Sequence, residues 1–383
     1  MSQKFLTDLF QAYYECRKHK RNTKQALAFE IHFEENIFKL YEEIQGRNYE
    51  ISPSSIFIIK KPVKREICAA DFRDRVIHHY IAQKLTPFLE TLFIYDSYAC
   101  RKWKGTLFWV KRAQKAIRTV SENSSKEAYI LKLDIAGFFM HIDHEILWRK
   151  LKNFIQDHFS ETSEEQEVLL YLCEKIVFHR PQENYILKSC KTSWNWLPKN
   201  KSLFFVELWK WLPLWNLTSQ VFANLYLHEF DIFMKQELRL KYYGRFVDDF
   251  FIFHQDKSFL LKIILKIQDF LKYKPWLTLH PKKIYLQDIS KWFLFLGTYI
   301  KPYRSYIWTH TKTNFYERIK NISWIETQDE LIYLRQSINS YLWFLKYTDS
   351  YRLREKIFKN ISKKQKNVYF SKNFQKCTIQ KKK

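Results

Sequence analysis

Two adjacent carboxylates, Asp248 and Asp249, stand between two short runs of aromatic and β-branched residues. The flanking runs, Tyr242–Phe246 and Phe250–Phe253, have the composition of short strands, which predicts that the acidic pair lies at the tip of a hairpin. Like charges held side by side repel each other, and a cation must offset them. Hard divalent cations prefer carboxylate oxygens, so a metal ion is the natural candidate. The alternative is a solvated Asp-Asp turn.

A third carboxylate, Asp134, ends a predicted strand over residues 128–133, far upstream of the acidic pair. Adjacent antiparallel strands would bring Asp134 within metal-bridging range of Asp248. Two metal ions about 3.5–4 Å apart could then activate an attacking hydroxyl and stabilise a leaving pyrophosphate. This is the chemistry of phosphoryl transfer, in which positioning and charge neutralisation do most of the work. His141 and His144 also invite a metal interpretation, but their rings need not converge, and we reject it.

The composition indicates a polyanionic partner. The 383-residue chain carries a formal net charge of +25, and 18% of its residues are aromatic. Lys and Arg interleaved with aromatic rings suit contact with phosphates and stacking on bases. An anionic membrane is the competing partner, but no uncharged apolar span of about 18 residues predicts a membrane helix, and we expect no membrane association.

The termini and the cysteines add further expectations. The residues Met1–Asp8 have no signal-peptide layout. The six cysteines form no Cys-x-x-Cys pair, so neither a zinc site nor a disulfide framework is indicated, and we expect a reducing, cytoplasmic location. Residues 352–383 hold twelve Lys or Arg and a single acidic residue, Glu355, which fits either a solvated tail or a nucleic-acid contact.

Apolar spacing predicts the elements that must position these residues. Helical spacing covers residues 5–45, 72–93, 144–154, a segment starting at Thr218, residues 259–271 and the chain from about residue 311. Strands are predicted over Ile56–Ile59, around Arg65–Ile67 and over Phe293–Ile300. Residues 180–215 are predicted to be irregular.

At its motifs the chain resembles a reverse transcriptase, and most closely the polymerase of diversity-generating retroelements. The segments that carry the resemblance are Arg65–His79, Ile94–Arg101, Lys132–Phe139, Leu212–Gln220, Phe246–Asp249, Leu279–Lys283 and Phe295–Gly297. The most specific of them is Leu212–Gln220, which ends in Asn-Leu-Thr-Ser-Gln. Phe246 departs mildly from the family, which more usually has Tyr at that position.

The resemblance implies an α+β fold, a right hand of fingers, palm and thumb with an antiparallel palm sheet. Residues 1–50 would form a helical N-terminal extension, residues 51–310 the catalytic fingers and palm, and residues 311–383 a helical thumb with a basic tail. The implied activity is an RNA-directed DNA polymerase that copies a template RNA into cDNA, with errors at adenines that diversify a target gene.

The resemblance also assigns roles to particular residues. Asp134, Asp248 and Asp249 would bind two Mg²⁺ ions, or Mn²⁺. Asp249 would either coordinate an ion directly or support a ligand without coordinating the ion itself. The implied nucleotide-binding residues are Arg65, Arg75 (or Arg73), Gln220, a steric gate at Phe139 (or Phe138) and Lys282 (or Lys283) at the pyrophosphate. Phe295, Leu296 and Gly297 would grip the primer end. Simpler alternatives are a core position for Phe139 and a solvated surface for the lysines.

The implied partners are a template RNA, an RNA–DNA duplex, deoxynucleoside triphosphates and a small basic accessory protein. Two other functions stay open. One is another bacterial reverse transcriptase of the phage-defence, retron or group II intron type. The other is a catalytically silent RNA-binding scaffold with the same fold.

The tryptophans depart from the family more sharply than any other residue type. Tryptophan stands where the family has glycine at Trp103, Trp109, Trp196, Trp209, Trp211, Trp215 and Trp292. The chain has 13 Trp and only 5 Gly, against a usual glycine share of about 7%. We hypothesise that the source organism reads UGA as glycine and that these codons are translated here as tryptophan. Several of these side chains should then be strained, exposed or intrude near Gln220, whereas burial of all of them would mark them as genuine.

Overall fold

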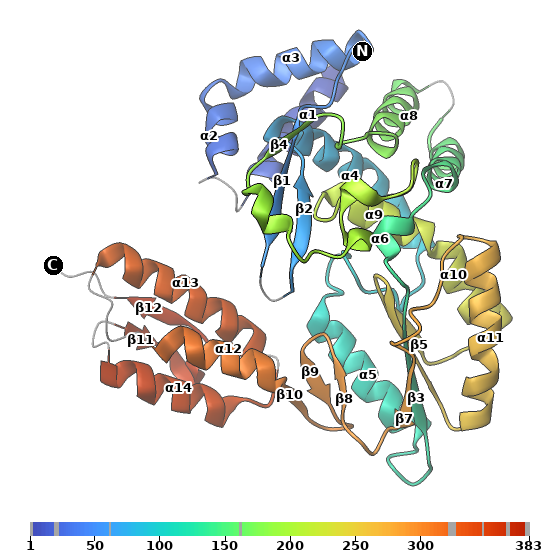
Figure 1. The fold of residues 1–383 in the computed structure, drawn as a ribbon, viewed down its shortest axis with the longest axis vertical. Coiled ribbons are helices and arrows are strands. Elements are labelled where there is room, and N and C mark those ends of the chain that lie inside the picture. The colour runs from blue at the N-terminus through green and yellow to red at the C-terminus, as the bar shows by residue number, and fades with distance from the viewer. Residues whose placement is uncertain are drawn as a thin grey trace. The chain divides into compact units, whose positions relative to one another are not determined.

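The computed structural model describes residues 3–18, 23–60, 63–160, 163–320, 327–346, 348–364 and 368–379. The fold is α+β, with mixed helices and antiparallel sheets (Figure 1). The chain divides into two compact units. The first unit comprises Met1–Lys102, Lys132–Ile252 and Ser258–Tyr285, and the second comprises Trp103–Leu131, Phe253–Lys257 and Leu286–Lys383. The three-part division at residues 50 and 310 stays a prediction.

The first unit begins with the predicted helical region. It contains α1 (Gln3–Arg17), α2 (Lys24–Ile31) and α3 (Phe33–Gln45). The apolar face of α1 packs against α4 (Phe72–Leu92), with Phe5 set edge-on to Tyr80. Asp71 caps α4 by accepting a hydrogen bond from the backbone of Arg73, because the first N–H groups of a helix lack partners within it.

A hairpin follows the N-terminal helices. Strands β1 (Ser54–Ile59) and β2 (Arg65–Ala69) pair antiparallel, as the sequence predicts, and β4 (Tyr185–Leu187) adds to β1 in parallel. The sequence does not predict β4, which lies in the segment expected to be irregular. That segment otherwise holds three short 3₁₀ helices, Lys191–Trp194, Lys199–Lys201 and Leu203–Phe205. The expected turn after Lys60 falls on residues 61–62, outside the described residues.

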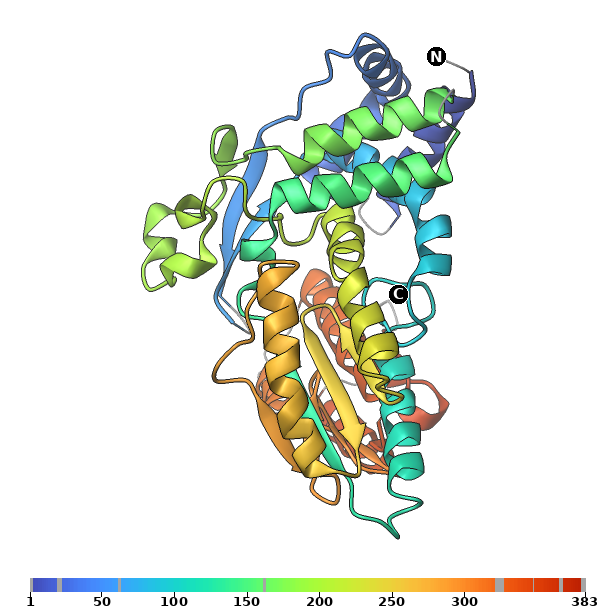
Figure 2. The ribbon, with the colours of Figure 1, turned by 90° about the vertical axis from the view of Figure 1, so that its right-hand side faces the viewer.

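A four-stranded sheet carries the acidic residues. Its strand order is β5-β6-β3-β7, with β5 (Tyr243–Phe246), β6 (Asp249–His254), β3 (Tyr129–Asp134) and β7 (Tyr285–Asp288). Helix α11 (Lys257–Tyr273) runs along the β5–β6 hairpin (Figure 2). The remaining helices of the first unit are α6 (Phe138–His141), α7 (His144–His158), α8 (Glu164–Val177), α9 (Leu217–Tyr226) and α10 (His228–Ile232), which continues into a π-helical turn, Phe233–Glu237.

The second unit contains α5 (Thr106–Val120) and a three-stranded sheet of β8 (Phe293–Phe295), β9 (Thr298–Ile300) and β10 (Ser305–Ile307). The prediction of one strand over Phe293–Ile300 is therefore wrong. Leu296 and Gly297 have φ values of +46° and +75°, in the left-handed region that turns the chain back on itself.

The C-terminal part of the second unit is helical, as predicted, with a small hairpin that the sequence does not predict. It contains α12 (Thr309–Lys320), α13 (Gln328–Leu345), α14 (Tyr351–Lys364), β11 (Val368–Phe370) and β12 (Cys377–Ile379). These elements share a core that includes Phe315, Leu342 and Ile357. Residues 365–367 and 380–383 of the basic tail lie outside the described residues. Within the described ranges, no helix is long and apolar enough to cross a membrane.

Candidate active site

The β5–β6 hairpin places Asp248 at its tip. Phe246 pairs with Asp249, so the turn consists of Val247 and Asp248 alone, and Asp249 opens β6. The hairpin therefore forms where the sequence predicts it. Val247 has a φ of +61°, which is rare for a β-branched residue. Such backbone strain persists only where the surrounding structure holds it.

Asp134 meets this turn from the neighbouring strand. The end of β3 lies against the start of β6, since the backbone N–H of Ile135 donates to the carbonyl of Asp248 at 3.1 Å. The carbonyl of Asp134 in turn accepts from the N–H of His280 at 2.8 Å. Asp134 is only 5% exposed. The structure thus brings the predicted acidic residues together at one end of the sheet.

Two lysines offset the three carboxylates. The ammonium of Lys283 lies 2.7 Å from Oδ2 of Asp134, and that of Lys132 lies 3.7 Å from Oδ1 of Asp249. Burial, followed by the charges of Asp249 and Asp134, raises the pKa of Asp248 to about 6. Burial also raises the pKa of Asp249, against the opposing effect of Lys132. Three carboxylates facing two ammonium groups leave the site short of positive charge.

The chemistry of this cluster fits a hard divalent cation. Carboxylate oxygens are the ligands that such ions prefer. Burial and the neighbouring Asp249 and Asp134 raise the pKa of Asp248, and Lys283 offsets this only in part. Among the described residues, however, no group of three or more His, Cys, Asp and Glu side chains is arranged to hold a metal ion, so the cluster offers the ligand type of a metal site without its arrangement. Lys283 pairs with Asp134, so a cation at that carboxylate would compete with its ammonium group.

A pocket of about 670 Å³ brings together the predicted nucleotide-binding residues Arg75 and Gln220. Its walls come from α1, from β1 and β2, from α4 and from the start of α9, and include Glu15, Cys16, Lys18, Phe57, Ile59, Ile67, Ala69, His78, His79 and Asn216. Arg65, Phe139 and the three aspartates are not among the residues that line it. Arg65 pairs with Ile59 and is exposed. Side chains two residues apart on a strand share a face, so Arg65 lies on the same face of β2 as Ile67 and Ala69.

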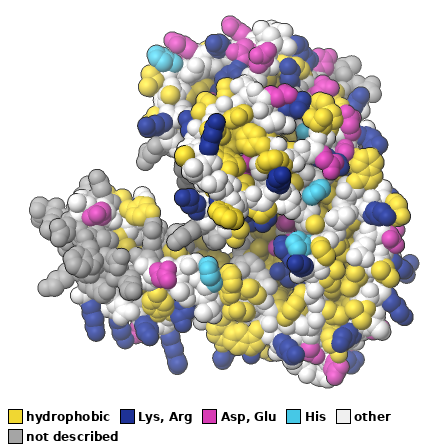
Figure 3. Space-filling view, in the orientation of Figure 1, with side chains coloured by type: hydrophobic (Ala, Val, Ile, Leu, Met, Phe, Trp, Pro, Cys, Tyr) yellow, Lys and Arg dark blue, Asp and Glu magenta, His cyan; other side chains and the backbone are white. Residues whose placement is uncertain are grey.

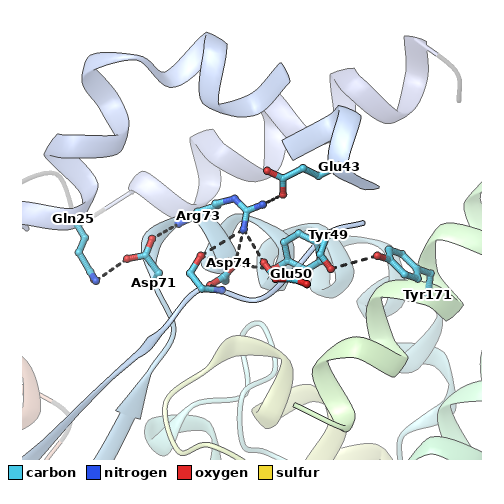
Figure 4. Close-up of polar contacts among 9 residues, drawn as sticks. Gln25, Glu43, Tyr49, Glu50, Asp71, Arg73, Asp74 and Tyr171 are labelled. Atoms are coloured by element: carbon cyan, nitrogen blue, oxygen red, sulfur yellow. Dashed lines mark hydrogen bonds and ion pairs between the residues drawn. The ribbon is translucent and has the colours of Figure 1, made fainter. Parts of the chain in front are cut away.

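The two candidate arginines of α4 differ in their surroundings. Arg75 lines the pocket while its Nε donates to the carbonyl of Ala70 at 2.8 Å. Arg73 is turned into a polar network with Glu43, Asp74 and the carbonyl of Glu50, and it does not line the pocket (Figure 4). These contacts favour Arg75 over Arg73 as the predicted triphosphate ligand.

The structure also separates the other paired candidates. Phe138 is buried against Tyr226, whereas Phe139 is half-buried, which favours Phe139 as the gate. The side chain of Lys283, not that of Lys282, reaches Asp134. This contact favours Lys283 over Lys282 for the predicted role at the pyrophosphate.

The structure places the predicted primer-grip residues at the β8–β9 hairpin. The ring of Phe295 is 1% exposed and stacks on Trp109, with ring centroids 4.0 Å apart, so this side chain belongs to the core. Leu296 and Gly297 form the tip of the hairpin. The primer-grip role of the three residues stays a prediction.

His141 and His144 each contact a backbone carbonyl. His141 lies 2.9 Å from the carbonyl of Gly137, and His144 lies 2.7 Å from that of Trp211.

Sequence reasoning missed Lys132 beside Asp249, although its position two residues before Asp134 places both side chains on one face of β3.

Six tryptophans in the described part of the chain adopt the left-handed backbone region that favours glycine. They are Trp103, Trp196, Trp209, Trp211, Trp215 and Trp276, with φ between +54° and +127°. The first five were predicted, Trp276 was not, and Trp109 and Trp292 do not share the feature. Trp196 is 97% exposed and Trp103 is 85% exposed. Trp215 lines the pocket beside Gln220, as the hypothesis of misread glycine codons predicts.

Comparisons with known proteins place the chain in a family. The model of the family described as reverse transcriptase (RNA-dependent DNA polymerase) matches residues 59–300. No curated protein sequence matches the chain. Among solved structures, telomerase from Candida albicans in complex with a TWJ fragment of telomeric RNA aligns with a TM-score of 0.48 and 11% identity, over 88% of this chain and 60% of that one. Apo telomerase from Candida tropicalis aligns with a TM-score of 0.48 and 14% identity, over 82% of this chain and 58% of that one.

The chain thus spans less than two thirds of the length of these telomerases. The family match itself covers more than half of the chain and includes Asp134, Asp248, Asp249 and Gln220. The chain therefore belongs to the reverse transcriptase family of RNA-dependent DNA polymerases.

Proposed function

We propose that this chain copies a template RNA into cDNA by metal-assisted phosphoryl transfer. The observation that carries the proposal is the meeting of Asp134 and Asp248 at one end of the sheet, where the Ile135 N–H bonds the Asp248 carbonyl. These carboxyl groups are buried beside Lys283, and a bound cation would further stabilise their ionised form. Family membership supports the same activity.

Asp134, Asp248 and Asp249 would hold two divalent cations, Mg²⁺ or Mn²⁺. When bound, such ions lower the barrier by activating the primer 3′-hydroxyl and by neutralising charge on the phosphates. Lys283 stands beside Asp134, where its ammonium group can neutralise negative charge on the departing pyrophosphate.

The pocket beside Gln220 would bind the incoming deoxynucleoside triphosphate. Arg75 lines the pocket and Arg65 lies on the same face of β2, so both guanidinium groups can bind phosphate oxygens in a bidentate manner. The half-buried ring of Phe139 would collide with a ribose 2′-hydroxyl and so select deoxynucleotides.

We assign the enzyme to the diversity-generating retroelement type. The support is the sequence segment Leu212–Gln220, whose last residue lines the pocket. This type implies frequent errors opposite template adenines and a small basic accessory protein as partner. Template RNA and the RNA–DNA duplex would bind through the basic surface of the chain, in keeping with its net charge of +25.

The direct test is primer extension on an RNA template with Mg²⁺ and the four deoxynucleotides, followed by sequencing of the cDNA. We expect full-length product, with substitutions concentrated at template adenines. A product without errors at adenines would still support the polymerase activity but would reject the assignment to the diversity-generating retroelement type. RNA binding without any extension would instead favour the silent scaffold. Phe139→Ala should increase incorporation of ribonucleotides, which separates a gate from a core phenylalanine.

A further inference from the structure

Arg245 is a fully buried arginine directly beneath the acidic turn. It lies in β5, and both Arg245 and its partner Asp231 are 0% exposed. The contact is bidentate, with Nε donating to Oδ1 at 2.8 Å and Nη2 donating to Oδ2 at 2.6 Å. The hydroxyl of Tyr243 donates to the same carboxylate at 2.6 Å. A planar guanidinium held in this way has a fixed orientation.

The remaining nitrogen of the guanidinium acts on the turn itself. Nη1 donates to the backbone carbonyl of Val247 at 3.0 Å. That carbonyl belongs to the peptide unit that leads into Asp248, and Val247 has the strained φ of +61°. Arg245 therefore contacts a backbone group whose rotation would redirect the Asp248 carboxylate.

Arg245 also connects the turn to the helix of the nucleotide pocket. Its Nη1 lies 3.3 Å from Oδ1 of Asn224 on α9, and the Asn224 amide donates to the carbonyl of Ala99 at 2.9 Å. Asn224 follows Gln220 by four residues, one turn along the same face of α9. A single side chain thus joins the helix that carries Gln220 to the hairpin that carries Asp248.

We propose that Arg245 is a positioning residue, which holds the Val247–Asp248 turn in its strained form and keeps it in register with Gln220. The inference rests on the proposed polymerase function and extends it to a residue that does not touch substrate. Stability alone does not account for the Arg245–Asp231 pair, because well-packed apolar residues of similar volume often stabilise a core as well as a buried ion pair.

The test compares the full-length wild-type chain with the neutral pair Arg245→Gln/Asp231→Asn, which leaves no unpaired buried charge. The control is Arg101→Gln/Glu90→Gln. Arg101 donates from both Nε and Nη2 to Oε2 of Glu90, and little of its own side chain is exposed. It also bonds the carbonyls of Ile94 and Ser97, not the acidic turn. Four quantities are measured: the thermal midpoint, the dissociation constant for an RNA–DNA primer–template, the Mn²⁺ dissociation constant by paramagnetic resonance, and the single-turnover rate of incorporation.

For the neutral pair we expect primer–template binding within about twofold of wild type, since the duplex-binding surface is unchanged. The Mn²⁺ affinity and the incorporation rate should each fall by roughly 10–100-fold, as found for groups that orient metal ligands. The control should lose less than about threefold in both. Wild-type values in a folded neutral pair, or equal losses in the control, would overturn the inference.

Two milder variants test the proposal if the neutral pair fails to fold. Arg245→Lys retains the charge but lacks the fork that bonds Asp231 and Val247 at once. Asn224→Ala removes the link from Arg245 to α9, together with the hydrogen bond to the Ala99 carbonyl, and leaves the ion pair intact. Both should lower the Mn²⁺ affinity or the rate, and wild-type behaviour of both would refute the proposal. An inactive wild type would instead reject the proposed polymerase function, while the Mn²⁺ affinities would still decide the role of Arg245.

Discussion

Asp248 is the residue on which the proposed chemistry depends most, because its carboxyl group is buried beside two others. Its raised pKa, about 6, means that part of the population holds a proton near neutral pH when no cation is bound. A metal ion must displace that proton, since ligands bind in the deprotonated form. The neighbouring Lys283 limits the repulsion by pairing with Asp134. Asp248 would therefore bind the metal ion, and Lys283 would limit the repulsion between the carboxylates.

Tryptophans with positive φ give the first residue-scale prediction. A left-handed backbone costs an L-residue about 1–2 kcal/mol, whereas glycine adopts it freely but loses about 0.5–1 kcal/mol in chain entropy. Trp196 is 97% exposed, so Trp196→Gly should raise the free energy of unfolding slightly, by roughly 0.5–1 kcal/mol. Urea denaturation measures the difference.

Trp109 is the matched control, because it is fully buried in α5 and stacks on Phe295. Trp109→Gly should destabilise the protein by about 3–5 kcal/mol, as for other large core truncations. If both changes destabilise, Trp196 is a genuine tryptophan. Reading the codons gives the independent answer, since UGG at these positions would end the hypothesis of misread UGA.

His78 predicts how stability depends on pH. It is buried, lies 2.6 Å from the Thr218 hydroxyl, and burial lowers its pKa to about 3. The unfolded chain has a His pKa near 6.5, so it binds the proton more tightly than the folded chain between these values. The contribution of His78 is thus fully present above about pH 6.5 and is lost as the pH falls.

The expected loss from His78 is about 2 kcal/mol at pH 5. His78→Gln keeps a polar partner for Thr218 and removes the titration, so its free energy of unfolding should fall less steeply between pH 7 and pH 5 than that of wild type. Parallel curves for the two proteins would show that His78 does not carry this dependence.

At the scale of elements, the sequence predicts most of the fold because periodic apolar patterns are local. The β1–β2 and β5–β6 hairpins and helices α4, α9 and α11 all form where spacing indicates them. The strand predicted over Phe293–Ile300 fails because its apolar run continues unbroken through a turn at Leu296 and Gly297.

The site could be predicted only in part, for a related reason. Acidic residues at strand ends are visible in the sequence, and so were the three aspartates. The Arg245–Asp231 pair depends on how elements pack, and no spacing rule gives that. Alternation along β3 places Lys132 on the face of Asp134, but its contact with Asp249 on the neighbouring strand also depends on packing. The burial of the Phe295 ring against Trp109 was likewise not visible in the sequence, because it depends on how α5 packs against β8.

Helix α14 carries a basic face that gives an element-scale prediction. Arg352, Lys356, Lys359 and Lys363 are exposed and recur at helical spacing, and Figure 3 shows a row of basic side chains over this helix. If each lysine meets one phosphate, Lys356→Gln/Lys359→Gln/Lys363→Gln should lower the salt slope of duplex binding by about 3.

The control for α14 is Lys262→Gln/Lys266→Gln/Lys272→Gln, which removes the same charge from the exposed face of α11. Filter binding across a salt series measures both slopes. An unchanged slope in the α14 variant, or an equal decrease in the α11 control, would show that the basic face of α14 makes no specific contact with the duplex.

At the scale of the whole molecule, the net charge of +25 predicts a grip on nucleic acid that depends strongly on salt. Phosphate contacts release counterions, so the logarithm of the affinity should fall linearly with the logarithm of the salt concentration. With about 6–10 contacts, affinity would drop roughly 10³–10⁵-fold between 50 and 200 mM salt. Little sequence preference is expected, because an A-form duplex is recognised by shape and 2′-hydroxyls. An affinity that stays constant over this range would contradict the prediction.

The most direct test of the central claim is single-turnover nucleotide incorporation by Asp248→Asn on an RNA template with Mg²⁺. Asp157→Asn, on the exposed face of α7, is the matched control. If the buried acidic cluster carries the chemistry, Asp248→Asn should bind primer–template as wild type does and lose about 10³-fold or more in rate, as when other charge-neutralising groups of phosphoryl transfer are removed. Asp157→Asn should keep the wild-type rate. A wild-type rate for Asp248→Asn would contradict the account.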